Sequence, residues 1–169
     1  MKLIQWIAFS CLVATPLWAD MAASATKAPG NAGFEKMKTL VGDWKGKTAE
    51  GADITITYRL VAAGSAVEEH LSFADMITMY HVDGANLMLT HYCAAGNQPR
   101  MRAGEFKDGD RILKFVFRDA TNLPDKKAMY MHDATFTFVD ADHLTAEWTH
   151  FIGGKAAGKV VMAMERVKS

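Results

Sequence analysis

Most of the chain consists of short segments in which apolar and polar residues alternate, and this two-residue period is typical of half-buried β-strands. In the clearest segment, residues 54–60, four apolar residues alternate with Thr55, Thr57 and Arg59. The same alternation predicts these further inward-facing sets: Val67, Glu69, Leu71 and Phe73; Ile77, Met79 and His81; Leu87, Leu89, His91 and Cys93; Leu113, Phe115 and Phe117; Tyr130, His132, Ala134, Phe136 and Phe138; Leu144, Ala146, Trp148 and His150; Val160, Met162, Met164 and Arg166. Counted from Asp43, the pattern predicts about ten strands.

The breaks between these segments are short and turn-like, as at Asp83-Gly84 and Gly153-Gly154. No helical pattern is long enough to cross between parallel strands, so neighbouring strands should be antiparallel. We therefore predict an all-β fold, an antiparallel up-and-down barrel, because closure removes exposed strand edges. A β-sandwich is the alternative. One short amphipathic helix should precede the strands, since apolar residues recur at helical spacing from Phe34 to Val41 and Asn31 can cap it.

Residues 1–25 have the features of a signal peptide: Lys2, a short apolar run and the cleavage pattern Ala23-Ser24-Ala25. Cleavage after Ala19 is the alternative. The run is short for a membrane span, so we expect a secreted or periplasmic protein without stable membrane insertion. Residues 26–33 would form a flexible leader, and residues 34–169 a single barrel domain.

The charge balance bears on the kind of partner the protein can bind, and the cysteine count bears on its redox state. The chain has 19 basic and 19 acidic residues, which argues against a nucleic-acid partner, since such proteins usually carry a basic face. Cleavage after residue 25 would remove Cys11 and leave Cys93 as the single thiol in an oxidising compartment. Cys93 would then be free, ligated or paired between chains.

Gly42-Asp43-Trp44 follows the expected helix and resembles the G-x-W signature of the lipocalin and calycin barrels. In those families the Trp closes one barrel end against an Arg or Lys from a late strand, which implies a structural cation–π pair between Trp44 and Arg166. Trp44-Lys45-Gly46 is also similar to the opening of nitrobindin-type haem barrels, although Thr48 stands where their second Gly falls. The runs 90–93 and 97–101 resemble a family of exported bacterial lipocalin-like proteins with no assigned activity.

Three inward side chains are candidates for chemistry. His91 and Cys93 share a strand face, where they could hold a metal or form an activated thiolate, or simply be core residues. Glu69 lies between apolar neighbours, so its pKa should be raised unless Arg100 or His91 pairs with it. A Glu–His pair would suit general acid–base catalysis, whereas a bulge would place Glu69 in solvent.

His132 and His150 should face each other across adjacent strands, beside Tyr130 and Trp148. Together with His91 they would supply three imidazoles, enough for zinc or haem iron if they converge.

The favoured hypothesis is an exported lipocalin-like barrel that binds a small apolar or amphipathic molecule. Its expected binding residues are His91, Cys93, Arg100, Tyr130, His132, Trp148 and His150. The alternatives are an enzyme that uses Glu69 and His91 on such a ligand, and a haem or metal barrel. The sequence assigns no cofactor, no metal-ligand set and no oligomeric state.

Overall fold

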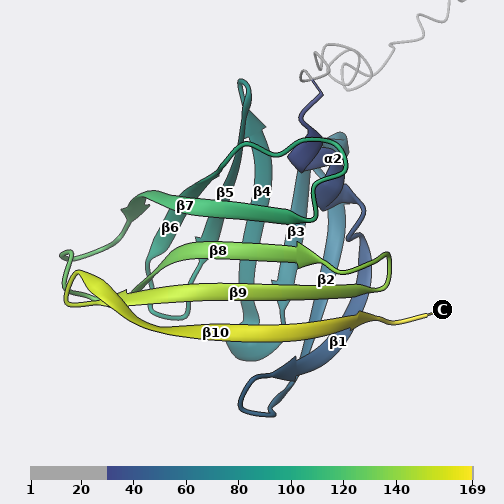
Figure 1. Cartoon of the computed structure of the whole chain (residues 1–169). Coiled ribbons are helices and arrows are strands. Elements are labelled where there is room, and N and C mark those ends of the chain that lie inside the picture. The colour runs from purple at the N-terminus through teal and green to yellow at the C-terminus, as the bar shows by residue number, and fades with distance from the viewer. Residues whose placement is uncertain (1–29, 169) are drawn as a thin grey trace, which may run out of the picture.

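A computed structural model describes residues 30–168, which form one helix, α2 (Ala32–Lys38), and ten strands (Figure 1). The strands are β1 (Gly42–Thr48), β2 (Asp53–Val61), β3 (Ala66–Leu71), β4 (Met76–Asp83), β5 (Asn86–Tyr92), β6 (Gln98–Ala103), β7 (Ile112–Thr121), β8 (Tyr130–Phe138), β9 (His143–Ile152) and β10 (Lys155–Arg166). Two single turns of 3₁₀-helix, η1 (Ala62–Gly64) and η2 (Phe73–Asp75), connect β2 to β3 and β3 to β4. The predicted signal peptide and residues 26–29 of the predicted leader lie outside the described residues.

The strands form one closed antiparallel barrel. Each strand pairs with its neighbours in the chain, and β1 pairs with β10 to close the ring, with Trp44 opposite Arg166 and Thr48 opposite Met162. The predicted up-and-down barrel is therefore confirmed, and the alternative of a β-sandwich is wrong. The fold is compatible with the calycin barrels.

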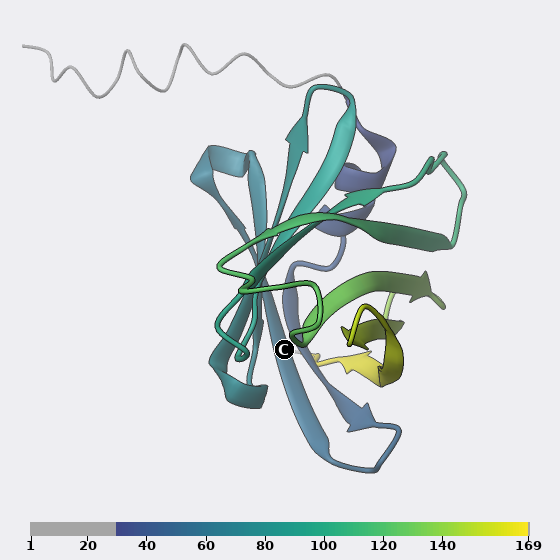
Figure 2. The same ribbon diagram turned by 90° about the vertical axis from the view of Figure 1, so that its left-hand side faces the viewer.

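Helix α2 covers one end of the barrel. Its N-cap is Asn31, whose side chain accepts a hydrogen bond from the backbone N–H of Phe34 at 2.9 Å, as the sequence predicts. Phe34, Met37 and Leu40 are buried against the strand ends. In Figure 2 this helix and the tip of the β1–β2 hairpin lie at opposite ends of the barrel. Within residues 30–168, no helix is long and apolar enough to cross a membrane.

The same end is closed by Trp44 and Arg166. The guanidinium carbon of Arg166 lies 4.3 Å from the centroid of the Trp44 ring, which is the cation–π pair implied by the resemblance. The indole N–H of Trp44 donates to the carbonyl of Leu40 at 2.7 Å. Arg166 donates to the carbonyls of Val41 at 2.8 Å and Thr39 at 2.6 Å, so it ties the last strand to the segment after α2.

Three details of the predicted alternation are wrong. In β4 the buried residues are Met76, Thr78 and Tyr80, one position away from the predicted set that contains Ile77. This strand is apolar on both faces, so its sequence does not fix which face turns inward. Phe73 was expected to face inward, but it belongs to η2 and is 68% exposed.

The third difference is in β8, where a bulge lies between Met131 and Asp133. The bulge puts Met131 opposite His150, so His132 has no direct partner on β9. The predicted cross-strand pair of His132 and His150 is therefore wrong.

Candidate functional site

The end of the barrel opposite α2 contains a cavity of about 310 Å³. It reaches the surface at the exposed residues Glu50, in the β1–β2 turn, and Phe73, in η2. Its apolar lining consists of Ala52, Ile54, Leu71, Phe73, Met76, Met131, Trp148, Val160 and Met162. Its polar lining consists of Thr48, Glu50, Asp53, Glu69 and His91. A largely apolar hollow with a few polar groups is the usual form of a small-molecule site.

Glu69 is the centre of a hydrogen-bond network inside the barrel. The residue is only 2% exposed, so the structure excludes the alternative in which a bulge turns it into solvent. The hydroxyls of Tyr58 and Tyr80 each donate to its Oε2 at 2.8 Å. The hydroxyl of Thr78 lies 3.2 Å from its Oε1. Three hydroxyl groups from β2 and β4 therefore satisfy a buried carboxyl group on β3.

Thr78 also links this network to His91 on β5. Its Oγ1 lies 2.9 Å from Nδ1 of His91, which is 3% exposed. Because Nδ1 is hydrogen-bonded to Thr78, Nε2 is the ring nitrogen that could bond to a further group. Nε2 is buried and has no hydrogen-bond partner among residues 30–168. The imidazole also packs on Trp148, with 4.9 Å between ring centroids.

Burial controls the acid–base properties of this network. Loss of hydration lowers the pKa of His91 to about 4, so its ring is neutral at neutral pH. Burial raises the pKa of Glu69, and the hydrogen bonds from Tyr80, Tyr58 and Thr78 oppose that rise. Burial and the adjacent Glu69 raise the pKa of Tyr58 and of Tyr80 well above the ordinary tyrosine value.

Two arrangements of protons satisfy the hydrogen bonds. When Glu69 is ionised, Thr78 donates to it and accepts from Nδ1–H of His91, which leaves Nε2 as an acceptor. When Glu69 is protonated on Oε1, it donates to Thr78, which donates to Nδ1, and His91 then carries its proton on Nε2. Thr78 thus couples the state of the carboxyl group to the tautomer of the imidazole.

The structure separates the predicted binding residues into two groups. His91 and Trp148 line the cavity, whereas the other five are not among its lining residues. Cys93 is a buried free thiol near the end of β5. Arg100 points to the outside of the barrel and pairs with Asp119 at 2.5 and 2.8 Å. The expected pairing of Arg100 with Glu69 is therefore wrong, because the tyrosines and Thr78 take that place.

The remaining three predicted residues lie at β8 and β9. His132 stacks on Phe151, with 3.9 Å between ring centroids, and its Nδ1 lies 2.9 Å from Asp133. Tyr130 packs at the edge of the same cluster, 5.9 Å from Phe151 between ring centroids. The His150 ring lies over Gly158 of β10. No three His, Cys, Asp or Glu residues in the described part of the chain are grouped as metal ligands.

Sequence reasoning missed three members of the network. Tyr58 was expected to face inward, but nothing in the sequence linked it to Glu69. Thr78 and Tyr80 were assigned to the outer face of β4, because the more hydrophobic Ile77 and Met79 were assigned to the core. The position of Glu69 could have indicated the network, because a carboxyl group on an apolar strand face requires hydrogen-bond donors nearby.

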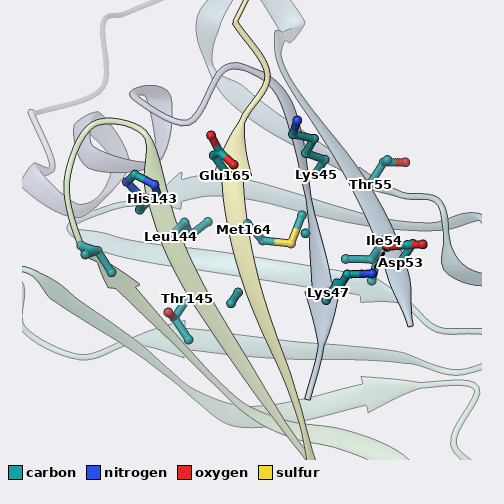
Figure 3. Close-up of a pocket in the computed structure, with 13 residues that line it drawn as sticks. Lys45, Lys47, Asp53, Ile54, Thr55, His143, Leu144, Thr145, Met164 and Glu165 are labelled. Atoms are coloured by element: carbon teal, nitrogen blue, oxygen red, sulfur yellow. Dashed lines mark hydrogen bonds and ion pairs between the residues drawn. The ribbon is translucent and has the colours of Figure 1, made fainter. Parts of the chain in front are cut away.

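A second, larger hollow lies on the outer surface and is drawn in Figure 3. This surface groove has a volume of about 760 Å³ and lies across β1, β2, β9 and β10. Its charged lining residues include Lys45, Lys47, Asp53 and Glu165. Lys47 and Asp53 form an ion pair, and these side chains are exposed. The groove contains no buried polar atom that lacks a partner in the described structure. We therefore place the candidate site in the smaller interior cavity.

Comparison with protein-family models finds no match, and comparison with curated proteins finds none either.

Proposed function

We propose that this protein is an exported lipocalin-like barrel that binds a small apolar or amphipathic molecule in the cavity beside His91. One observation carries the proposal: a largely apolar cavity, open at one end, includes an imidazole whose Nε2 is buried without a partner in the described chain. A buried polar atom without a partner costs about 1–3 kcal/mol, and a ligand that bonds to it recovers part of that cost.

The chain has two tryptophans in its described part, and they make the proposal testable. Trp148 lines the cavity, whereas Trp44 is at the closed end beneath α2. Naphthalene is a suitable apolar probe, and its binding can be followed through the indole N–H signals in ¹H–¹⁵N spectra. We expect saturable shifts at Trp148 and none at Trp44. Shifts of equal size at both indoles, or no shift at either, would contradict the proposal.

A pair of variants checks the location of the probe. Val160→Phe adds bulk within the cavity and should weaken naphthalene binding at least tenfold. Val116→Phe makes the same change at an exposed position on the outside of β7 and should leave binding unchanged. Equal affinity in the two variants would place the probe elsewhere.

The network favours a second candidate, an enzyme that acts on such a ligand through Glu69 and His91. Thr78 joins these groups into a path along which a proton can move, as general acid–base catalysis requires. Native mass spectrometry of wild type and Glu69→Gln, each purified from its source cells, distinguishes the two candidates. A binding protein should carry the same molecule in both forms. An enzyme should carry a product in the wild type and the unreacted substrate in the variant.

The proposed export has a direct test. Cleavage after Ala25 predicts a mature protein that begins at Thr26. N-terminal sequencing of protein from the periplasm or culture medium should find this residue. An intact Met1 on protein that accumulates in the cytoplasm would contradict export.

A further inference from the structure

From the protons and charges around the cavity, we propose that its ligand is a compact, uncharged molecule whose polar group is a single hydroxyl, hydrogen-bonded to Nε2 of His91. This inference rests on the proposed function, since it specifies the chemistry of the molecule that the cavity binds.

The charges around the cavity exclude an anionic ligand. Three carboxyl groups line it, those of Glu50, Asp53 and Glu69, and none of its lining residues from the described chain is Lys or Arg. His91 is neutral at neutral pH because burial lowers its pKa to about 4. A bound carboxylate would therefore lose its hydration without gaining a cation, which is strongly unfavourable.

The interior is equally unsuited to a cationic ligand. The carboxyl group linked to His91 through Thr78 is that of Glu69, and its oxygens are already used by Tyr58, Tyr80 and Thr78. The carboxyl groups of Glu50 and Asp53 are exposed at the mouth of the cavity, and Asp53 is paired with Lys47. A cationic ligand bound at Nε2 would therefore lie too deep in the cavity to pair with the carboxyl groups of Glu50 and Asp53. An uncharged ligand requires no counter-ion.

The two proton arrangements favour a hydroxyl over a carbonyl or an ether as the uncharged polar group. Nε2 of His91 is an acceptor when Glu69 is ionised and a donor when Glu69 is protonated. A carbonyl or ether oxygen can only accept, so it fits one arrangement and is left unpaired in the other. A hydroxyl can donate or accept, so it bonds to Nε2 in both.

The volume of the cavity limits the size of the apolar part of the ligand. At about 310 Å³, the cavity is roughly twice the 150 Å³ of an engineered apolar cavity that takes up benzene. A fused two-ring molecule matches that volume. Because Nε2 is buried, a lining side chain must move for the ligand to reach it. Met76, Met131 and Met162 line the cavity with flexible, unbranched side chains that can adapt.

Four probes of similar shape test the inference: naphthalene, 2-naphthol, 2-naphthoate and 2-(aminomethyl)naphthalene, each titrated by calorimetry at neutral pH. We expect 2-naphthol to bind about tenfold more tightly than naphthalene, the gain typical of one good hydrogen bond. The two charged probes should bind more weakly than naphthalene. If either charged probe binds most tightly, or if 2-naphthol gains nothing over naphthalene, the inference is overturned while the proposed function stands. If naphthalene also fails to bind, both fail.

The role of His91 has its own test. In His91→Phe the roughly tenfold advantage of 2-naphthol over naphthalene should disappear, because the hydrogen bond to Nε2 is lost. His70→Phe is the matched control, since His70 is on the outer surface and pairs with Asp75 at 2.5 Å. A 2-naphthol advantage that survives in His91→Phe would contradict the assignment.

A measurement on the wild-type protein covers the case in which His91→Phe does not fold. The ¹⁵N signal of Nε2 in His91 should shift when 2-naphthol is added and stay nearly unchanged with naphthalene. Equal shifts with the two probes would show that the hydroxyl does not reach Nε2.

Discussion

The two ends of this barrel differ in how completely their polar groups are satisfied. At the end beneath α2, the indole of Trp44 has a carbonyl partner and the guanidinium of Arg166 has several. At the other end, Nε2 of His91 and Oδ1 of Asn97 are buried without a hydrogen-bond partner in residues 30–168. Under the proposed function, the closed end would contribute mainly to stability and the open end to ligand binding.

Truncation of Trp44 should have the largest effect on stability. Trp44→Ala removes a fully buried indole and the cation–π partner of Arg166, so we expect a loss of about 3–5 kcal/mol in the free energy of unfolding, measured by urea denaturation. The affinity of the remaining folded protein for naphthalene should not change. A variant that keeps its stability but loses naphthalene binding would reverse the roles of the two ends.

Acid should destabilise the open end through His91. Its pKa is about 4 in the folded protein and about 6.5 in the unfolded chain, so the folded state binds fewer protons between these values. The stabilisation from a neutral His91 is complete above pH 6.5 and declines as the pH falls to 4, by about 3 kcal/mol in total.

The acid effect is measured as a difference between wild type and His91→Gln, by urea denaturation at several pH values. Glu69 acts in the opposite sense, because its raised pKa makes the folded state less stable as the pH rises above 4.5. The comparison is therefore made at each pH separately. Parallel stability profiles for the two proteins would show that His91 titrates normally.

Loss of the Arg166 guanidinium should have a smaller effect than loss of Trp44. Arg166→Leu removes the cation–π contact and the hydrogen bonds to Thr39 and Val41, for an expected loss of about 2 kcal/mol. Arg102→Leu, at an exposed position on β6, is the control and should cost less than about 0.5 kcal/mol. Equal thermal midpoints for the two variants would contradict a structural role for Arg166.

The smallest effect on stability is expected at the mouth of the cavity. Phe73 is 68% exposed, so Phe73→Ser should change the free energy of unfolding by less than about 0.5 kcal/mol. Naphthalene binding should weaken about threefold, because an apolar part of the cavity wall is lost. Val116→Ser, an exposed apolar residue on β7, should leave binding unchanged. A stability loss as large as that of Arg166→Leu would show that Phe73 is a core residue.

Much of the fold could be predicted from the sequence, because the physical signals for it are local. Alternation placed Ile56, Leu89 and Met164 inside, and the short turns required antiparallel neighbours. The prediction failed where a single extra residue changes the alternation, as at the β8 bulge beside His132. It also failed in β4, where both faces are apolar and pairing with β3 and β5 determines which side turns inward.

The candidate site could be predicted only in part. Glu69 and His91 stood out because polar residues on apolar faces require partners. Their connection through Thr78 depends on the register in which β3, β4 and β5 pair, with Glu69 opposite Thr78 and Thr78 opposite His91. That register is a property of three strands together, so no pattern within one strand contains it.

Closure of the ring by β1 and β10 has a consequence for how the protein is made. These are the first and last strands of the barrel, so the ring cannot close until residues 155–166 are available for pairing. Before that point β1 and β9 both present unpaired edges, which favour association with other chains. If the chain is exported as proposed, it would complete its fold only after its last strand has crossed the membrane. A chaperone that holds the unfinished barrel would have to shield two edges at once.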